Sequence, residues 1–449
     1  MAGLYDVLVK KYNACPPDCR LCEEACAHRD EKVSDAVMKT IHIPELGFNG
    51  VISCIQCSSP RCLEICPTGA IVKNEQDGVV RITEERCVGC GMCTMACPYG
   101  GIYYDRERTK PLKCDNCNGN PVCVPACPYG VLEFRRNSRV QDYLQAGDLL
   151  SPGTRACAGC PAELAMRFAL RVLGQDTVLF TAPGCMTVLA LGYEDKATVA
   201  TAVYPCMFTN VASTMTGVYR YYKHVGRDVQ LVAFVGDACS ADISFQVISG
   251  AAERGEKLIY IVYDNEGCMN TGIQRTSTTP LGAWTNTDPV GEEFHGKSQA
   301  SKDMPMIMLA HNIPYVATAT IAFLEDFAQK LTKAMRVRDG MSYIHLLSPC
   351  PTGWRAAPDM SIELSRLAVE TNYFPLWEAE NGQLQLTVEI PNPRPVKEYL
   401  KTMGRFAHLT EDDFNKVQEL VDSKLNKIRH LALMSSQTAT EAKTRSARY

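Results

Sequence analysis

The sequence predicts a two-part protein in which a small, cysteine-rich α+β domain precedes a larger α/β domain with a parallel sheet covered by helices. Sixteen of the 23 cysteines fall between Cys15 and Cys127, and the other seven are spread over the rest of the chain. From Thr154 onward, continuous apolar runs alternate with helical stretches, which is typical of parallel strands joined by helices. The 449 residues are enough for two or more hydrophobic cores.

The overall composition excludes several classes of protein. With 46% hydrophobic residues, a net charge of -4 and no run of Lys and Arg, the sequence gives no indication of a nucleic-acid-binding surface. Residues 1–11 lack the apolar run of a secretory signal. Residues 304–324 are interrupted by His311 and Pro314, which predicts a core helix and a strand and no membrane span. We therefore expect a cytoplasmic protein, whose closely spaced thiols bind metal and do not form disulfides.

Four groups of four cysteines occupy the first part of the chain. The groups are Cys15, Cys19, Cys22, Cys26; Cys54, Cys57, Cys62, Cys66; Cys87, Cys90, Cys93, Cys97; and Cys114, Cys117, Cys123, Cys127. The third group has the spacing of a bacterial ferredoxin run, in which three thiolates bind one cubane and the fourth binds its neighbour. Structural zinc is the alternative, because paired C-x-x-C motifs also build tetrahedral sites. A triplet with a displaced fourth cysteine, repeated four times, favours iron and sulfur.

The order of these groups resembles the four-cluster ferredoxin subunits that serve formate dehydrogenases, hydrogenases and dimethyl sulfoxide reductases. The resemblance covers residues 1 to about 135 and implies nested pairing, in which the middle two groups exchange last ligands and the outer two do likewise. The implied sets are Cys54, Cys57, Cys62 with Cys97; Cys87, Cys90, Cys93 with Cys66; Cys15, Cys19, Cys22 with Cys127; and Cys114, Cys117, Cys123 with Cys26. Between Cys15 and Cys19 the chain departs from the pattern, with three intervening residues where two are usual.

Local patterns predict the domain boundaries. Short β-rich runs at 70–72 and 101–104 follow Cys-Pro turns and predict the small sheets of a ferredoxin fold. A stretch without a sustained apolar period closes with Ser-Pro-Gly before the second domain. The expected organisation is a ferredoxin-like domain with four [4Fe-4S] clusters at 1–135, a linker at 136–153, a cofactor-binding α/β domain at 154–375, and a C-terminal extension and loose tail at 376–449.

Polar residues follow two apolar strand runs of the second domain. The run 231–235 leads into Gly236-Asp237-Ala238, and the run 259–263 leads into Asp264-Asn265-Glu266-Gly267. The carboxyl ends of parallel strands form the edge where ligands bind. Mg²⁺ takes carboxylate and amide oxygens and keeps positions for substrate phosphates. Taken alone, this pair of loops fits a solvated turn equally well.

The longer sequence around both loops, from Gly236 to Gln274, resembles the thiamine diphosphate motif of the 2-oxoacid:ferredoxin oxidoreductases, including its Asn-Thr-Gly-x-Gln ending at 270–274. The resemblance implies that Asp237, the Asn265 side chain and the Gly267 carbonyl hold Mg²⁺. It places Asn270 beside the reacting thiazolium as the catalytic residue. Ala238 stands where the motif usually has glycine. The implied cofactor-binding residues are Gly236, Asp237, Ala238, Asp242, Asn265, Gly267, Asn270, Thr271 and Gln274.

The same resemblance implies a fifth [4Fe-4S] cluster beside the thiamine cofactor. Its ligands would be Cys157, Cys160, Cys185 and Cys350. For a lone cysteine the ordinary interpretation is a small buried apolar residue, and we keep it for Cys206, Cys239 and Cys268. Cys239 and Cys268 nevertheless lie within the cofactor motif and could line its pocket.

Together these resemblances imply the β subunit of an enzyme like pyruvate:ferredoxin oxidoreductase, which converts a 2-oxoacid and coenzyme A to acyl-CoA and CO₂. Electrons would pass through the clusters to ferredoxin or to a flavin/NAD-binding subunit. No motif supplies the glutamate that activates thiamine, so we expect activity only with α and γ-type partner subunits. The fused four-cluster module favours an aromatic 2-oxoacid enzyme of the phenylglyoxylate dehydrogenase type. The alternatives are an electron-transfer-only polyferredoxin subunit and a zinc-stabilised interaction protein.

Overall fold

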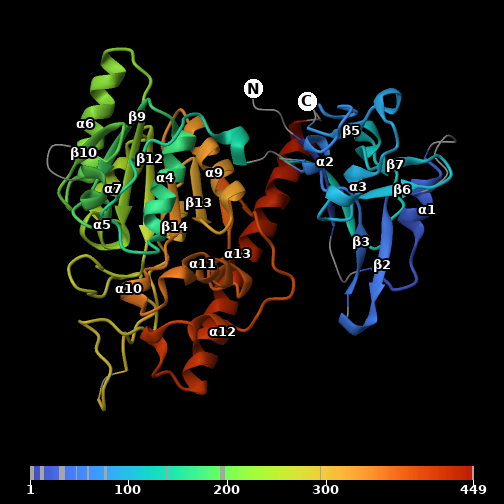
Figure 1. Ribbon diagram of the computed structural model, residues 1–449. Coiled ribbons are helices and arrows are strands. Elements are labelled where there is room, and N and C mark those ends of the chain that lie inside the picture. Colours follow the sequence, from blue (N-terminus) through green and yellow to red (C-terminus); the bar gives the residue numbers. More distant parts are fainter. Residues whose placement is uncertain are drawn as a thin grey trace. The chain divides into compact units, whose positions relative to one another are not determined.

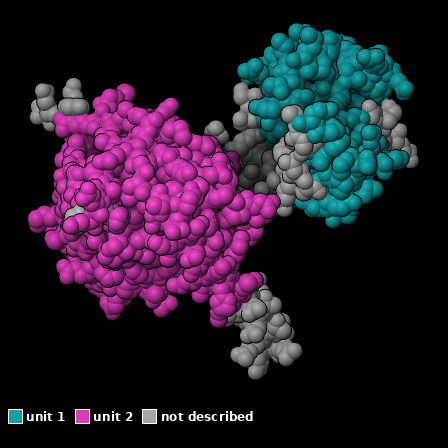
Figure 2. Space-filling model, turned by 90° about the horizontal axis from the view of Figure 1, so that it is seen from below, with its two compact units in different colours: residues 1–142 teal, residues 143–449 magenta. Residues whose placement is uncertain are grey.

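The computed structural model describes residues 5–10, 15–29, 36–46, 48–57, 60–74, 78–137, 140–192, 198–293 and 295–446. Contacts divide the chain into two units, residues 1–142 and 143–449, which Figure 2 shows in different colours. The division falls within the segment 136–153.

The described strands of the first unit form four two-stranded antiparallel sheets (Figure 1). The pairs are β1 (Tyr5–Lys10) with β8 (Leu132–Asn137), β2 (Lys39–Ile43) with β3 (Phe48–Ile52), β4 (Ile71–Lys73) with β5 (Val80–Ile82), and β6 (Ile102–Asp105) with β7 (Lys110–Lys113). Strands β4 and β6 are the two predicted after Cys-Pro turns. The short helices are α1 (Leu21–Ala27), α2 (Arg61–Glu64) and α3 (Met92–Ala96). Helix α1 carries two cysteines of the first group, and α2 and α3 carry one cysteine each.

Cysteines make up much of the interior of this unit. One buried cluster contains Cys15, Cys22, Cys26, Cys114 and Cys123, and a second contains Cys62 and Cys93. Aliphatic side chains, among them Val51, Leu112 and Leu132 in the first cluster and Ile71, Val80 and Ile102 in the second, pack with these thiols.

A single sheet runs through the second unit, and Figure 1 shows its strands between helices. The strand order is β10 (Ala202–Pro205), β9 (Thr177–Thr181), β11 (Gln230–Gly236), β12 (Leu258–Asp264), β14 (Met341–Leu347), β13 (Tyr315–Thr320), β15 (Trp377–Glu380) and β16 (Gln383–Leu386). The first six strands are parallel, and β15 and β16 add to them in antiparallel fashion.

Helices cover both faces of this sheet, as the sequence predicts. They are α4 (Pro161–Leu173), α5 (Cys185–Leu191), α6 (Val211–His224), α7 (Phe245–Glu253), α8 (Met304–Ala310), α9 (Leu324–Arg336), α10 (Pro351–Trp354), α11 (Ser361–Glu370), α12 (Val396–Leu400) and α13 (Glu411–Ser446). Alternate residues of β11 and β12 pack with α6, α7 and α8. Helices α4 and α9 lie side by side (Figure 1), and the tilted rings of Phe168 and Phe327 pack with their centres 5.7 Å apart.

Strands β12, β13 and β14 are buried along their whole length, which explains their continuous apolar sequences. The segment 304–324 forms α8 and β13, as predicted. Among the described residues, no helix is both long and apolar enough to cross a membrane.

The structure differs from expectation at both ends of the second unit. Residues 145–151, expected to be linker, pack against it. Leu149 and Leu150 are buried, and Ser151 donates its N–H to the Thr198 carbonyl at 2.8 Å. The C-terminal extension supplies β15 and β16 to the sheet, and the expected loose tail is helical to Ser446. Both differences arise because the segments are short. Leu149 and Leu150, and the four-residue strands β15 and β16, are too short to show the hydrophobic periodicity from which secondary structure is predicted.

Candidate active site

Two neighbouring strand ends place the predicted ligands together. Strands β11 and β12 pair in parallel, with Gly236 opposite Tyr263. Asp237 follows β11, and Asn265 follows β12 at the same edge of the sheet. Both side chains are buried. The backbone therefore brings the two strand ends, and the residues that follow them, to one edge of the sheet.

The Asn265 side-chain amide lies against two oxygen atoms at this edge. The amide atom that faces them is 2.8 Å from the Gly267 carbonyl oxygen and 3.1 Å from Asp237 Oδ1. Oxygens that bind Mg²⁺ at about 2.1 Å in an octahedron lie about 3 Å apart, so the donor set fits this cation. If the Asn265 amide is rotated so that its nitrogen faces these two oxygens, the NH₂ group donates a hydrogen bond to each of them, and no cation is needed.

Two threonines hold the other oxygen of the same carboxylate. Thr276 and Thr278 donate to Asp237 Oδ2 at 2.6 and 2.9 Å. Thr278 also lies 2.9 Å from Asp264 Oδ1, so its hydroxyl bridges two buried carboxylates. Burial and the charge of Asp264 raise the pKa of Asp237 well above its usual range. A divalent cation here would remove the electrostatic cost that raises this pKa.

A buried polar chain supports the neighbouring strand end. Asp264 Oδ2 lies 2.8 Å from Nε2 of His345, and Nδ1 of His345 lies 3.3 Å from the Tyr343 hydroxyl. That hydroxyl reaches Ser240, in the π-helical turn η5 (Ala238–Ile243), at 3.0 Å. Burial opposes ionisation of Asp264, but its hydrogen bonds, led by that from His345, lower its pKa. The chain therefore ties together the ends of β11, β12 and β14.

The other predicted cofactor residues lie on the rim of this site or in a turn beyond it. Ala238 is buried at the start of η5, whereas Asp242 is exposed and accepts the Ser277 N–H at 3.0 Å. Asn270 is exposed. Thr271 and Gln274 hydrogen-bond to one another, with Gln274 Nε2 donating to the Thr271 carbonyl at 2.9 Å. The structure therefore brings Asp237, Asn265 and Gly267 together, and Asn270, Thr271 and Gln274 form a separate exposed turn.

The two thiols of the cofactor motif differ in their surroundings. Cys239 is fully buried, and its Sγ atom lies 3.6 Å from the Phe208 carbonyl. Cys268 is half-buried. Burial and the charges of Asp237 and Asp242 raise the pKa of Cys268 to about 11.

Four cysteines from distant segments gather in the second unit. Burial and the charges of Cys160 and Cys350 raise the pKa of Cys185 to about 12. Cys157 also acts on this thiol. A hydrogen bond fixes the turn between Cys157 and Cys160, because the Ser361 hydroxyl donates to the Gly159 carbonyl at 2.5 Å. Gly159 has a φ of +71°, and a Cβ there would lie 1.9 Å from the Pro358 carbonyl oxygen, so only glycine fits this turn.

The outer cysteine groups of the first unit approach one another. Burial and then the charge of Cys127 are the largest causes that raise the pKa of Cys22 to about 11. Burial and the charges of Cys114 and Cys26 raise the pKa of Cys123 to about 12. Cys15, Cys22, Cys26, Cys114 and Cys123 share one buried cluster, and Cys19 and Cys127 pack against it, so the two outer groups lie together.

The second and third cysteine groups also approach one another. Burial and the charges of Cys54 and Cys97 raise the pKa of Cys57. One small cavity is lined by the four thiols of the remaining set, which are Cys66, Cys87, Cys90 and Cys93. In the part of the chain that the structure describes, no three His, Cys, Asp or Glu side chains converge tightly enough for a single metal ion. A cubane instead spreads its four thiolates over the corners of a larger cluster.

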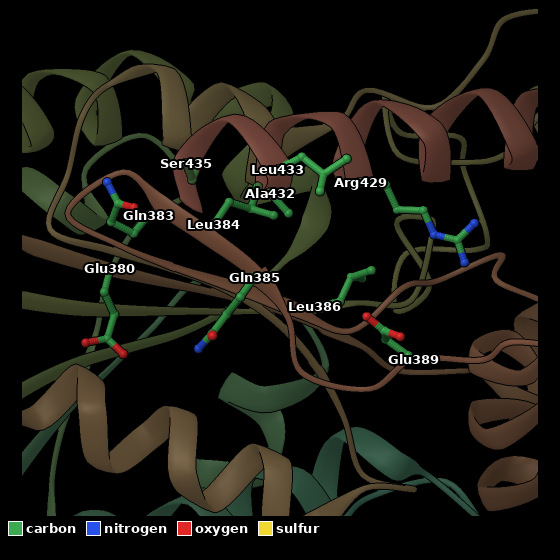
Figure 3. Close-up of a pocket in the computed structure, with 10 residues that line it drawn as sticks. All are labelled: Glu380, Gln383, Leu384, Gln385, Leu386, Glu389, Arg429, Ala432, Leu433 and Ser435. Atoms are coloured by element: carbon green, nitrogen blue, oxygen red, sulfur yellow. The ribbon is translucent and has the colours of Figure 1, made fainter. Parts of the chain in front are cut away.

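A groove of about 650 Å³ lies elsewhere on the second unit, between the β15–β16 hairpin and α13. Figure 3 shows Arg429 and Glu389 at one end and Glu380 at the other, so the charged groups do not converge. Its lining includes none of the predicted ligands.

Comparison with known proteins identifies the family. A 4Fe-4S dicluster domain matches residues 51–137, and the C-terminal TPP binding domain of thiamine pyrophosphate enzymes matches residues 183–346. The β subunit of NADH-dependent phenylglyoxylate dehydrogenase from Aromatoleum evansii is 43% identical over 416 residues, which cover 90% of this chain and 92% of that protein. The chain belongs to the 2-oxoacid:ferredoxin oxidoreductase family.

Other members of the family match a smaller share of the chain. Pyruvate synthase subunit PorB of Methanothermobacter thermautotrophicus is 47% identical over 63% of this chain and 98% of its own length. Ketoisovalerate oxidoreductase subunit VorB of Pyrococcus furiosus is 41% identical over 62% of this chain and 92% of its own length. This oxidoreductase subunit therefore combines a thiamine diphosphate-dependent α/β domain with an iron–sulfur domain, which confirms the predicted fold class and function.

Proposed function

We propose that Asp237, Asn265 and Gly267 bind Mg²⁺ and, through it, the diphosphate of thiamine diphosphate. The observation that carries the proposal is the position of the Asn265 side-chain amide, which lies 2.8 Å from the Gly267 carbonyl oxygen and 3.1 Å from Asp237 Oδ1 at the ends of β11 and β12. When bound, thiamine diphosphate supplies the carbanion that attacks the 2-oxo carbon and stabilises the charge left when CO₂ departs. The protein's part is to fix the cation: Thr276 and Thr278 orient the Asp237 carboxylate.

We assign Asn270 to the substrate-facing side of this site. It is exposed in a turn that begins at Cys268, the half-buried thiol next to the carboxylates. The exposed turn holding Asn270, Thr271 and Gln274 faces outward in this chain, where a partner subunit would complete the pocket. The glutamate that activates thiamine is expected from the α subunit, so this chain acts only within a complex with α and γ-type subunits.

The 20 cysteines of five sets would hold five [4Fe-4S] clusters. Support comes from the nested approach of Cys127 to Cys22, of Cys26 to Cys123 and of Cys97 to Cys57. Cubanes accept electrons singly, so a series of them can carry away the two electrons of each turnover. Such clusters, and a thiol-rich chain in general, suit a reducing cytoplasm.

An aromatic 2-oxoacid is the substrate class that the comparisons favour. The relative that spans both units is the phenylglyoxylate dehydrogenase subunit, whereas the pyruvate and ketoisovalerate relatives match 62–63% of the chain. That relative is NADH-dependent by name. We therefore propose NAD, reached through a flavin-binding partner subunit, as the acceptor, with ferredoxin as the alternative.

A substrate panel tests this function. The anaerobically purified complex is mixed with coenzyme A, NAD⁺ or ferredoxin, and one of pyruvate, 2-oxoglutarate, indolepyruvate or phenylglyoxylate. We expect CO₂ and acyl-CoA to form fastest with an aromatic 2-oxoacid. Preference for pyruvate would contradict the aromatic assignment. Failure of every 2-oxoacid to reduce the clusters would favour the electron-transfer-only alternative.

The bridging threonine gives a test of the metal site. Thr278→Val removes the hydroxyl between Asp237 and Asp264 and leaves two buried carboxylates facing each other. Loss of a group that orients a metal ligand typically costs about 10–100-fold in metal affinity. We expect a loss of this size in Mg²⁺ titrations of cofactor binding to the complex.

The matched control is Thr332→Val, which removes a hydroxyl that bonds only to the Ala328 carbonyl of α9. Its Mg²⁺ affinity should stay within twofold of the unmodified complex. An equally small change in Thr278→Val would contradict the proposed metal site.

A further inference from the structure

Glu266 stands between two proposed metal ligands in a costly conformation. It separates Asn265 from Gly267 and has a φ of +60°, in the left-handed region that side chains other than glycine rarely adopt. Such a conformation costs about 1–3 kcal/mol and persists only where the surroundings enforce it. The side chain is also 5% exposed, so a carboxylate is buried at this turn.

The C-terminal extension supplies the group that holds this turn. Arg405, in the short helical turn η7 (Gly404–Phe406), forms an ion pair with Glu266 Oε2, and both side chains are buried. Tyr373 donates its hydroxyl to Glu266 Oε1 at 2.8 Å. Burial raises the pKa of Glu266, and Arg405 acts in the opposite direction. A buried charge at this turn therefore depends on its partner for stability.

A tryptophan joins the same arginine to the adjacent ligand. The Arg405 guanidinium lies 3.8 Å from the centre of the Trp354 ring, within cation–π range. Trp354 Nε1 in turn donates to the Asn265 backbone carbonyl at 2.8 Å. Arg405 thus contacts one neighbour of Asn265 directly and restrains Asn265 itself through the indole.

The same contacts reach the loop of the proposed fifth cluster. Trp354 is the last residue of α10, which begins directly after Cys350. Gly404 donates its N–H to the Arg355 carbonyl at 3.0 Å, and this hydrogen bond joins η7 to the loop that follows Cys350. Trp354 also donates its backbone N–H to the Cys350 carbonyl at 2.8 Å, so the indole that Arg405 stacks on belongs to the loop of the proposed cluster.

We propose that Arg405 is a positioning residue that locks the Asn265–Gly267 metal loop to the Cys350 cluster loop and places a positive charge beside the cluster. This inference rests on the proposed metal and cluster sites. It assigns the C-terminal extension a role in aligning the two redox partners and in setting the potential of the electron acceptor nearest the cofactor.

The test uses Arg405→Met and Glu266→Gln in the anaerobically purified complex. Two quantities are measured: the Mg²⁺ dissociation constant in the presence of thiamine diphosphate, and the midpoint potential of the EPR signal that is absent from a Cys350→Ser complex. We expect both variants to weaken Mg²⁺ binding about 10–100-fold. The potentials should move in opposite directions. Losing the arginine removes a positive charge and lowers the potential, whereas losing the glutamate charge leaves Arg405 unneutralised and raises it.

Arg405→Lys keeps the charge but loses the planar fork that pairs and stacks. It should leave the potential near that of the unmodified complex while still weakening Mg²⁺ binding, and it replaces Arg405→Met if that complex does not assemble. Lys330→Met is the control, because it breaks another buried ion pair, with Asp326, in the same unit. It should change neither quantity.

Two results would overturn the inference. The first is that the potentials of Arg405→Met and Glu266→Gln move in the same direction, or that their Mg²⁺ affinity stays within twofold of the unmodified complex. Arg405 would then contribute packing alone and would not position the metal loop. If the unmodified complex binds neither Mg²⁺ nor thiamine diphosphate, the proposed function fails and the inference fails with it.

Discussion

Asp237→Ala is expected to abolish binding of Mg²⁺ and thiamine diphosphate, and with it all 2-oxoacid-dependent turnover, while leaving the iron content unchanged. Magnesium sites depend on one or two carboxylates together with phosphate oxygens. Asp237 is the carboxylate that converges with Asn265 and Gly267, and no cysteine set includes it. Cofactor analysis, iron analysis and reduction by dithionite on the same preparation measure the three expectations together.

The control for this variant is Asp228→Ala, which removes an exposed carboxylate paired with Lys257 and Arg338. Exposed ion pairs contribute about 0–1 kcal/mol, so cofactor content and turnover should be unchanged. If Asp237→Ala retains stoichiometric thiamine diphosphate and near-normal turnover, Asp237 is a turn residue and the cofactor assignment is wrong.

Cys185→Ala is expected to produce the opposite pattern. Removing one of four thiolates from the set with Cys157, Cys160 and Cys350 should remove about four iron atoms per chain, by the content of one cubane. Thiamine diphosphate should remain bound, because the metal ligands are intact. Turnover should fall to background since the nearest electron acceptor is missing, although dithionite should still reduce the clusters of the first unit. Iron content, bound thiamine diphosphate and the optical change on adding a 2-oxoacid report these effects.

Cys206→Ala is the matched control, because Cys206 is a buried thiol outside the five sets. It should retain all of the iron and its turnover within twofold. Full iron content in Cys185→Ala, or undiminished reduction of the clusters by a 2-oxoacid, would remove Cys185 from the proposed electron path.

The sequence was sufficient where a signal is local. Continuous apolar runs predicted β11 and β12, and the parallel arrangement of these strands follows from the helix between them. Because parallel strands end at one edge, the meeting of Asp237 and Asn265 could be predicted as well. The small strands β4 and β6 were predicted from the β-rich runs after Cys-Pro turns.

Contacts between distant residues escaped prediction. Arg405 lies 139 residues from Glu266, and nothing in the residues around either one signals a pair. His345 stands alone in an apolar strand, where a histidine carries no motif, yet it bonds to Asp264. Thr276 and Thr278 belong to a Thr-Ser-Thr-Thr run that has the composition of an ordinary polar loop. Only the structure shows that both hydroxyls hydrogen-bond to Asp237.

The central claim is that one chain holds a thiamine diphosphate site and five clusters. Anaerobic analysis of the purified complex for iron, magnesium, zinc and thiamine diphosphate tests it most directly. The account predicts about 20 iron atoms, one Mg²⁺ and one thiamine diphosphate for each copy of this chain, after subtraction of iron bound by the partner subunits. About 16 iron atoms would exclude the cluster at Cys157, Cys160, Cys185 and Cys350. Zinc in place of iron, or a complex without thiamine diphosphate, would contradict the account.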